Sequence, residues 1–271
     1  MPVFLALINM KIGIALSGGG TRGMVHAGAL QALEEMGIQL DVISGTSAGS
    51  IVGAMYANGY SPEEIFDIAS QKNFLQLLSL RIPSKGFVKH SALRKSLEKY
   101  LPKDSFEDLA KPLFIAISNL HTGLVEIKSS GKLHDVIIAS SSVPIIFEPI
   151  DIDGDLYVDG GLMKNLPASV LREHADLVIG VNLVPQLRVP NKELSGIIGV
   201  AVRCFNLSAL NNITPELRYC DVVIEPKEIH SYSRYNFKQM KEMYQIGYEE
   251  TMKMMPGIKS AIQEEEKIGG S

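Results

Sequence analysis

Short apolar runs alternate with longer amphipathic stretches along most of the chain. The apolar runs are rich in Ile, Val and Leu and are bounded by Gly, Asn, Asp or Pro, a pattern typical of buried strands. We expect strands at 11–17, 41–44, 111–120, 123–128, 149–152, 156–158, 176–182 and 221–225. The intervening stretches predict helices at 24–36, 50–57, 61–69, 91–102, 133–142 and 233–255, with another helical stretch beginning near 193.

This order of elements predicts the fold class. Apolar strands separated by helices form a largely parallel sheet that helices cover on both faces. Two connections, at His121-Thr122 and Asp153-Gly154, are short enough for hairpins, which add antiparallel pairs. We therefore expect an α/β fold, a three-layer α/β/α sandwich with a mostly parallel central sheet. Because no internal repeat or linker divides the chain, we expect a single domain over residues 10–271.

The two ends of the chain carry different signals. Residues 1–9 are apolar, but they lack a basic region and a cleavage site, so we expect a dispensable extension rather than a signal peptide. Residues 263–271 are charged and end in Gly-Gly-Ser, which predicts a frayed tail. Since we find no other stretch long enough to cross a bilayer, we expect no transmembrane segment.

Composition narrows the classes of function. The formal net charge of −4 provides no electrostatic footprint for nucleic acid, so we expect no nucleic-acid partner. The two cysteines, Cys204 and Cys220, are too few for a disulfide framework or a metal site. We expect both to be reduced and buried, which favours a reducing, cytoplasmic location. Hydrophobic residues make up 46% of the chain, enough for one large core.

The sequence Gly45-Thr46-Ser47-Ala48-Gly49 follows a predicted strand and precedes a predicted helix. A serine between two such glycines is typical of a nucleophile on a sharp strand-to-helix turn. A side chain larger than hydrogen at Gly45 or Gly49 would enter space where strand and helix nearly touch. The pattern predicts that Ser47 is a nucleophile.

A glycine-rich loop, Gly18-Gly19-Gly20-Thr21-Arg22-Gly23, joins the first strand to the first helix. Backbone amides at a helix amino terminus converge on one point and favour negative charge, as an oxyanion hole requires. The loop also matches the dinucleotide fingerprint Gly-x-Gly-x-x-Gly. In that alternative an acidic residue holds a ribose at the carboxyl end of the second strand, whereas Asp41 stands before this strand.

A carboxylate at the end of the hairpin is the candidate base. Asp159 ends a predicted strand and is followed by Gly160 and Gly161, which leave room around its side chain. A carboxylate within hydrogen-bond reach could take the serine proton directly. A Ser-acid-His triad is the alternative, and its histidine would be His174 or His230. We interpret His26, behind the glycine loop, as structural.

Together these three elements resemble the patatin-like phospholipase family, acyl hydrolases that use a Ser–Asp dyad. The similarity covers about residues 12–171, the catalytic core of that family, and the compact chain resembles its bacterial single-domain members. It is reinforced by His26-Ala-Gly-Ala-Leu30, by Ala139-Ser-Ser-Ser-Val-Pro144 and by Asn165-Leu-Pro167. The site residues that the resemblance implies are the nucleophile Ser47, the proton acceptor Asp159, an oxyanion hole of Gly18, Gly19, Gly20 and Arg22, and the supporting glycines Gly23, Gly45, Gly49, Gly160 and Gly161.

The resemblance implies hydrolysis of carboxylic esters of lipids, of the phospholipase A or lysophospholipase type, through an acyl-enzyme. It implies no cofactor and no metal. The partners would be a lipid or fatty-acyl ester and, transiently, a membrane or micelle surface. Segment 73–83 is apolar on every side, so it is either a core element or a cover that offers residues 74–80 to lipid. A catalytically idle lipid-binding protein is the alternative from another functional class.

Overall fold

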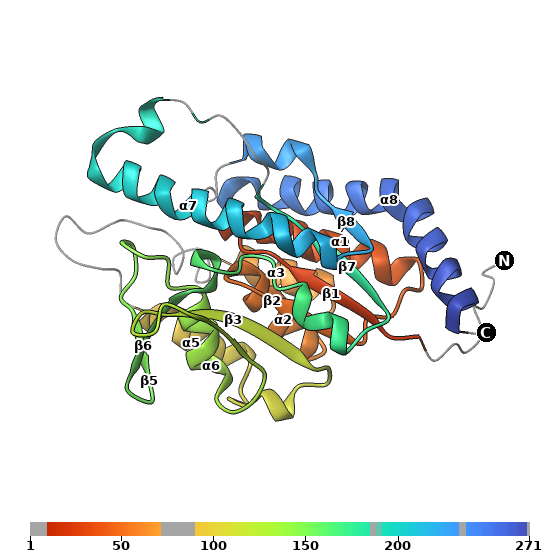
Figure 1. Ribbon diagram of the computed structural model, residues 1–271, viewed down its shortest axis with the longest axis horizontal. Coiled ribbons are helices and arrows are strands. Elements are labelled where there is room, and N and C mark those ends of the chain that lie inside the picture. The colour runs from red at the N-terminus through yellow and green to blue at the C-terminus, as the bar shows by residue number, and fades with distance from the viewer. Residues whose placement is uncertain (1–9, 72–89, 185–188, 190, 233–236, 270–271) are drawn as a thin grey trace.

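The computed structural model describes residues 10–71, 90–184, 189, 191–232 and 237–269. Within these residues the chain folds around one mixed sheet of eight strands (Figure 1). The predicted extension 1–9 and the predicted lipid-contacting segment 74–80 lie outside the described residues, so both stay predictions.

The sheet has the order β5-β6-β3-β2-β1-β7-β8, and β4 also pairs with β3. The strands are β1 (Ile12–Leu16), β2 (Val42–Gly45), β3 (Leu113–Asn119), β4 (Val125–Lys128), β5 (Ile150–Ile152), β6 (Asp155–Asp159), β7 (Leu177–Val181) and β8 (Val222–Ile224). The pairs among β3, β2, β1, β7 and β8 are parallel. The two predicted hairpins, β3–β4 and β5–β6, are antiparallel, as is the pair β3–β6.

Helices cover both faces of this sheet (Figure 1). The α-helices are α1 (Met24–Glu35), α2 (Ala48–Ala57), α3 (Pro62–Ser70), α5 (Ser91–Tyr100), α6 (Leu133–Ser140), α7 (Gly196–Glu216) and α8 (Met240–Gly269). One face packs against the larger group, which includes α1, α2 and α8. The other face packs against α7 and the short 3₁₀ helix η4 (Ser169–Glu173). The predicted three-layer α/β/α class is confirmed.

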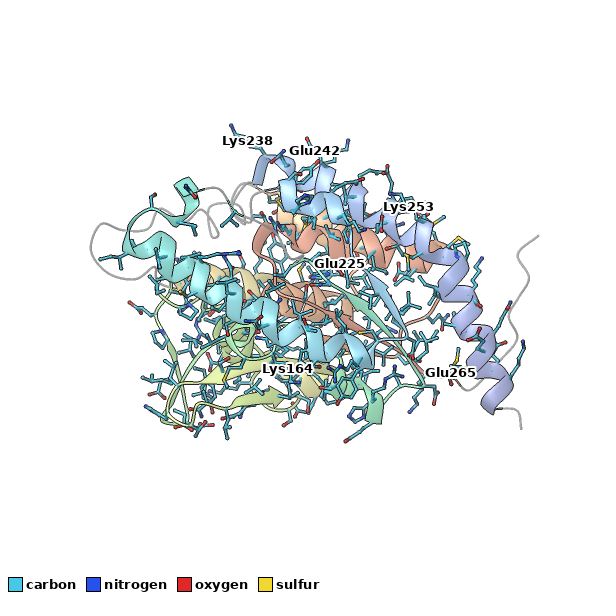
Figure 2. All side chains as sticks on the ribbon, turned by 45° about the horizontal axis from the view of Figure 1, so that its top comes forward. Lys164, Glu225, Lys238, Glu242, Lys253 and Glu265 are labelled. Atoms are coloured by element: carbon cyan, nitrogen blue, oxygen red, sulfur yellow. The ribbon has the colours of Figure 1, made fainter. Side chains whose placement is uncertain are left out.

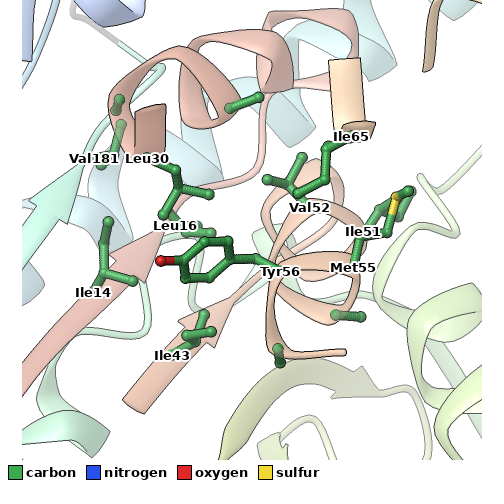
Figure 3. Packing of buried hydrophobic residues seen from close by; sticks show 14 of the residues in the cluster. Ile14, Leu16, Leu30, Ile43, Ile51, Val52, Met55, Tyr56, Ile65 and Val181 are labelled. Carbon is green, nitrogen blue, oxygen red and sulfur yellow. The ribbon is translucent and has the colours of Figure 1, made fainter. Parts of the chain in front are cut away.

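The alternation of side chains along β1 divides the core between the two layers. Ile14 and Leu16 point into the large helical layer, where Figure 3 shows them beside Leu30 of α1 and Tyr56 of α2. Ala15, with the opposite direction, packs in the smaller cluster with residues of η4. Both sides of the strand are therefore buried, as its continuous apolar sequence predicts.

Local signals in the sequence explain where several helices begin. The predicted capping box is present at α3, because the Ser61 hydroxyl accepts from the Glu64 amide and the Glu64 carboxylate accepts from the Ser61 amide. The helix predicted at 233–255 appears as α8, and it continues to Gly269. The prediction of a frayed tail over 263–271 is therefore wrong for residues 263–269, which are helical. Ile258 and Ile262 explain the extension, since both are buried on the core side of α8.

The cysteine prediction is also partly wrong. Both cysteines are free, but Cys204 is exposed on α7 and Cys220 is half-buried. Burial raises the pKa of the Cys220 thiol to about 12. The apolar sequence around Cys204 does not indicate burial because α7 itself presents apolar residues to solvent.

Candidate active site

Ser47 lies on a strained turn between β2 and α2. Its φ of 53° and ψ of −120° fall outside the regions that L-residues ordinarily occupy. The flanking glycines allow this turn: a Cβ on Gly45 would lie 2.5 Å from the carbonyl oxygen of Gly49, and one on Gly49 would overlap the Leu16 carbonyl. Strands β1 and β2 and helix α2 thus meet where only glycine fits.

Hydrogen bonds hold this turn from both sides. The Ser47 amide donates to Ser140 Oγ over 2.9 Å, and this hydroxyl donates onward to the Ala116 carbonyl over 2.8 Å. The Ser47 carbonyl accepts from Ser50 Oγ over 2.6 Å. Ser140 belongs to a motif noted in the sequence, but the sequence did not indicate this contact. The backbone of Ser47 is therefore fixed by α6 and β3 as well as by its own helix.

Asp159 ends β6 and is only 1% exposed. Its Oδ1 accepts from the Gly161 amide over 2.7 Å, which fixes the carboxylate. Gly160 is needed at the turn because a Cβ there would overlap the Ala116 carbonyl. The same β3 residue therefore contacts both loops: its carbonyl accepts from Ser140 and lies against Gly160.

The register of three strands relates Ser47 to Asp159. Gly45 at the end of β2 pairs with Ile115 of β3, and Ile117 of β3 pairs with Asp159 of β6. Ser47 stands two residues beyond Gly45, and Ile117 stands two residues beyond Ile115. Both candidate catalytic residues therefore lie at the same level along the sheet, on the two sides of β3.

The glycine loop lies over Ser47. A Cβ on Gly18 would be 3.2 Å from Ser47 Cβ, so the loop backbone is in contact with the candidate nucleophile. The Gly18 amide donates to the Asn165 carbonyl over 3.1 Å. Within the described residues, no backbone hydrogen bond is recorded for the amides of Gly19 and Gly20 at the start of the 3₁₀ helix η1 (Gly20–Gly23). Of the three predicted backbone donors of the oxyanion hole, the amides of Gly19 and Gly20 therefore remain candidates, because the Gly18 amide already has an acceptor.

Arg22, another predicted member of the oxyanion hole, contacts backbone carbonyls. Its Nε and Nη2 donate to the Tyr232 carbonyl over 2.9 and 2.7 Å, and Nη2 also donates to the His230 carbonyl over 3.2 Å. Nη1 lies 3.4 Å from the carbonyl oxygen of Leu183. These bonds fasten the glycine loop to the segments that follow β7 and β8. They indicate a positioning role for this side chain.

His26, which we interpret from the sequence as structural, lies behind the glycine loop in α1. His26 is fully buried, and its Nε2 donates to the Ser17 carbonyl over 2.7 Å, while Nδ1 makes no hydrogen bond with the part of the chain that the structure describes. Burial lowers its pKa to about 4, so it is neutral near pH 7. This environment supports the interpretation of His26 as structural.

His174 lies at the amino-terminal edge of the parallel strands. The nearby Asp176 amide donates to the Lys11 carbonyl just before β1, whereas Ser47 lies beyond the other end of the strands. Five residues of β1 separate these edges by about 16 Å. His174 instead stacks on Phe114, with ring centroids 4.6 Å apart. This arrangement argues against His174 as a triad member. His230, the other candidate, lies in the 3₁₀ helix η7 (Lys227–Ser231), which follows β8.

Asp41 lies at the same amino-terminal edge. Its Oδ2 accepts from the Ile12 amide over 2.8 Å, and its own amide donates to the Ile12 carbonyl. The acidic residue with the spacing of a ribose ligand is therefore at the opposite edge of the sheet from the glycine loop. This position weakens the dinucleotide alternative. In the described part of the chain, no group of three His, Cys, Asp or Glu residues is arranged to hold a metal ion.

A small apolar cavity of about 40 Å³ begins beside the glycine loop and the residue after Ser47. Its walls come from η1, α1, α2, α3 and α8, and almost all of its surface is apolar. The lining residues are Gly20, Thr21, Gly23, Met24, Ala48, Ile51, Val52, Met55, Ile65, Ala69 and Met240. A larger hollow, lined by Glu34, Tyr60, Lys111 and their neighbours, is at the amino-terminal edge and takes no part in the candidate site.

The model of the family described as patatin-like phospholipase matches residues 14–172. The curated relatives include lysophospholipase nte1 of Aspergillus fumigatus, 27% identical over 94% of this chain and 19% of that protein. Lysophospholipase NTE1 of Saccharomyces cerevisiae is 26% identical over 89% of this chain and 16% of that protein. The chain thus spans about a fifth or less of the length of these relatives.

Two solved structures share the fold at low sequence identity. VipD of Legionella pneumophila has a TM-score of 0.54 and 16% identity, over 92% of this chain and 67% of that chain. Human GIVD cytosolic phospholipase A2 also has a TM-score of 0.54, with 10% identity over 95% of this chain and 60% of that chain. At these identities the similarity concerns the fold alone.

Proposed function

Because the chain belongs to the patatin-like phospholipase family, we propose that it hydrolyses carboxylic esters of lipids through a Ser47–Asp159 dyad. The observation that carries this proposal is the common level of Ser47 and Asp159 on either side of β3, with the glycine loop in contact with Ser47. The lysophospholipase names of the relatives support a phospholipase A or lysophospholipase type of reaction.

In this mechanism Asp159 takes the proton of Ser47 Oγ as that oxygen attacks the ester carbonyl carbon. The carbonyl oxygen becomes an oxyanion, which the Gly19 and Gly20 amides stabilise; losing one such donor typically slows turnover about 100- to 1,000-fold. The tetrahedral intermediate collapses as Asp159 gives the proton to the departing alcohol, leaving an acyl group on Ser47. The bond from the Gly161 amide orients the carboxylate for both transfers.

Deacylation repeats these steps with water. Asp159 takes a proton from the water as its oxygen attacks the acyl carbon, and the same two amides stabilise the second oxyanion. Collapse breaks the bond to Ser47 Oγ, which recovers the proton from Asp159 while the fatty acid leaves. Each proton that the carboxylate accepts is thus returned within the cycle, and the chemistry needs no metal or cofactor.

We place the fatty-acyl chain along the apolar cavity, whose volume of about 40 Å³ would have to grow by movement of its methionine side chains. Its walls include Gly20 of the glycine loop and Ala48 next to Ser47, so an acyl group on the serine could extend directly into it. Met24, Met55 and Met240 line the cavity, and flexible thioether side chains adapt to chains of different shape. The proposed partners are a lipid ester and, transiently, a lipid surface. The free cysteines agree with the proposed cytoplasmic location.

The experiment that tests this function is labelling by a fluorophosphonate, which reacts with activated serines. We expect the wild-type protein to be labelled and to release fatty acid from a lysophospholipid, and Ser47→Ala to do neither. Ser260→Ala is the control, because this serine is exposed on α8. Labelling that persists in Ser47→Ala would exclude the assigned nucleophile. Lipid binding by a wild-type protein that the probe does not label would instead support the idle lipid-binding alternative.

A further inference from the structure

Helix α7 is unusually apolar for a helix that faces solvent. Between Gly196 and Asn212 its only charged residue is Arg203. By length and composition alone, the stretch Gly196–Tyr219 could cross a membrane, with a mean hydropathy of 1.2 over its best window, yet only 11% of that window is buried. The sequence-based expectation of no such segment overlooked this helix.

Four exposed apolar residues of α7 share one face. Ile197, Val200, Cys204 and Leu207 are all exposed, and their spacing of three, four and three residues places them in a single stripe. Ile197 is 88% exposed and Val200 50% exposed. The same face continues through Asn211 and Thr214, which are exposed but polar. The stripe is thus apolar in the amino-terminal half of the helix and polar in the carboxyl-terminal half.

The opposite side of α7 is fastened to the loop that carries Asp159. Ser208 Oγ donates to the Leu162 carbonyl over 2.6 Å, and Asn212 Nδ2 donates to the Gly161 carbonyl over 3.0 Å. Glu216 near the end of the helix forms an ion pair with Lys164, which Figure 2 shows beside this half of α7. A helix anchored by such polar contacts to the protein does not cross a bilayer in this fold.

The amino-terminal half of α7 extends past the end of β1 (Figure 1). That end of the parallel strands is also the edge that carries Ser47. By contrast, α8 presents charged side chains such as Glu242 and Lys253 to solvent (Figure 2). The apolar stripe is therefore confined to a helix that is joined to the candidate site.

We propose that the amino-terminal half of α7 inserts into the surface of a phospholipid membrane, with the helix axis tilted and the polar half outside. This inference rests on the proposed function, because a site for lipid esters must meet its substrate at such a surface. Arg203 is the single charge of this half, and one basic residue is compatible with the headgroup region of a lipid surface.

A second copy of the chain fits the stripe less well. A standard protein interface buries about 800 Å² on each partner, contributed by roughly 20–30 residues. The stripe offers four side chains on three helical turns, with Leu194 and Ile198 beside it. Shallow insertion into lipid requires no such area, because an amphipathic helix enters the headgroup boundary by its apolar face alone.

The chain contains no tryptophan, so a single introduced tryptophan reports its own surroundings. We suggest Ile197→Trp and Val200→Trp in a Ser47→Ala background, mixed with phosphatidylcholine vesicles that carry brominated acyl chains. Insertion predicts that vesicles shift the emission of both variants to shorter wavelength and quench it. The matched controls Asn211→Trp, on the polar part of the stripe, and Leu124→Trp, at an exposed position 63% accessible in another part of the fold, should change little.

Quenching that is absent at 197 and 200, or equal at all four positions, would overturn the inference. A shift that depends on protein concentration without vesicles would instead identify a second copy as the partner. Ile197→Ser with Val200→Ser should lower vesicle partitioning about tenfold or more, since two apolar side chains no longer enter lipid. Leu120→Ser with Leu124→Ser, which removes two exposed leucines elsewhere, should leave it unchanged.

Activity separates this inference from the proposed function. Hydrolysis of a soluble butyrate ester by the wild-type protein, with no quenching of the tryptophan variants, would contradict only the role of α7. Quenching of the two tryptophan variants, combined with a wild-type protein that hydrolyses no ester, would contradict only the proposed function. For the Ile197→Ser, Val200→Ser variant we expect full butyrate turnover and a loss on vesicles, because neither residue belongs to the catalytic loops.

Discussion

Asn165 and Gly18 are joined by two hydrogen bonds. The Gly18 amide donates to the Asn165 carbonyl over 3.1 Å, and Asn165 Nδ2 lies 3.4 Å from the Gly18 carbonyl oxygen that accepts from it. The Oδ1 atom of the same side chain lies against Gly161, where it would be 2.7 Å from a Cβ. Asn165 therefore connects the glycine loop to the loop of Asp159.

Removal of this connection should reduce turnover more than stability. For Asn165→Ala we expect kcat to fall by about 100-fold with little change in KM, because a misplaced oxyanion loop weakens contacts made in the transition state. Steady-state kinetics with a soluble ester measures the change. An unchanged kcat would show that the two loops hold their positions without this side chain.

The dyad makes a prediction about additivity. Ser47→Ala and Asp159→Asn should each abolish ester hydrolysis while leaving the fold intact, and the double variant should be no slower than either single variant. Single-turnover assays and circular dichroism provide the measurements. If Asp159→Asn retained most activity and His230→Ala lost it, the base would be the histidine of a triad.

Gly19 and Arg22 should respond differently to alanine. A Cβ on Gly19 would lie 2.8 Å from Leu183 Cδ1, so Gly19→Ala should displace the oxyanion amides and lower turnover, with a small change in unfolding free energy. Arg22→Ala leaves the buried Leu183 carbonyl and two part-buried carbonyls without their donor, so it should also lower the free energy of unfolding by about 1–3 kcal/mol. Urea titrations and kinetics on the same preparations separate the two effects. Equal loss of stability in both variants would contradict the distinction.

The apolar cavity predicts a chain-length effect. Ala69 lines the cavity on α3 and is buried, so Ala69→Leu should fill part of the space. We expect kcat/KM to fall for esters of long fatty acids and to stay near the wild-type value for a butyrate ester. Overpacking typically costs about 1–3 kcal/mol of stability, which the butyrate assay controls for. Equal losses for all chain lengths would place the acyl chain elsewhere.

His26 predicts a dependence of stability on pH. Burial lowers its pKa in the folded protein from 6.5 to about 4, so between these values the unfolded chain binds a proton that the folded chain does not. Stability should therefore decrease as pH falls from 6.5 to 4, by up to about 3 kcal/mol. In His26→Gln, whose amide could still donate to Ser17, this part of the decrease should disappear from urea titrations across that range. Parallel curves for the two proteins would contradict it.

Local signals predicted most of the fold. An apolar run predicted strand β1, and two glycines at fixed distances from Ser47 predicted the turn before α2. Both signals lie within a few residues of the feature that they predict. The contacts between these elements join residues that are far apart in the sequence, so no local pattern predicts them. The Ser47 amide, for example, bonds to a serine 93 positions later.

Two further features of the structure could not be predicted from the sequence. The sequence indicates an oxyanion loop, but it does not show that the Gly18 amide already bonds to Asn165. Nor does an apolar helix reveal whether its apolar residues face a core or the solvent. Ile197 and Cys204 are examples: their apolar neighbours in the sequence suggest burial, but both lie on the exposed side of α7.

The bond between the Ser47 amide and Ser140 Oγ also bears on the order of folding. It closes a loop of 93 positions, and long loops are costly in chain entropy until the contacts that they enable have formed. The strained turn at Ser47 therefore receives this support only after α6 has docked on β3. During refolding, reactivity of Ser47 toward a fluorophosphonate should appear after the helical circular dichroism signal, which makes it a reporter of the last steps of assembly.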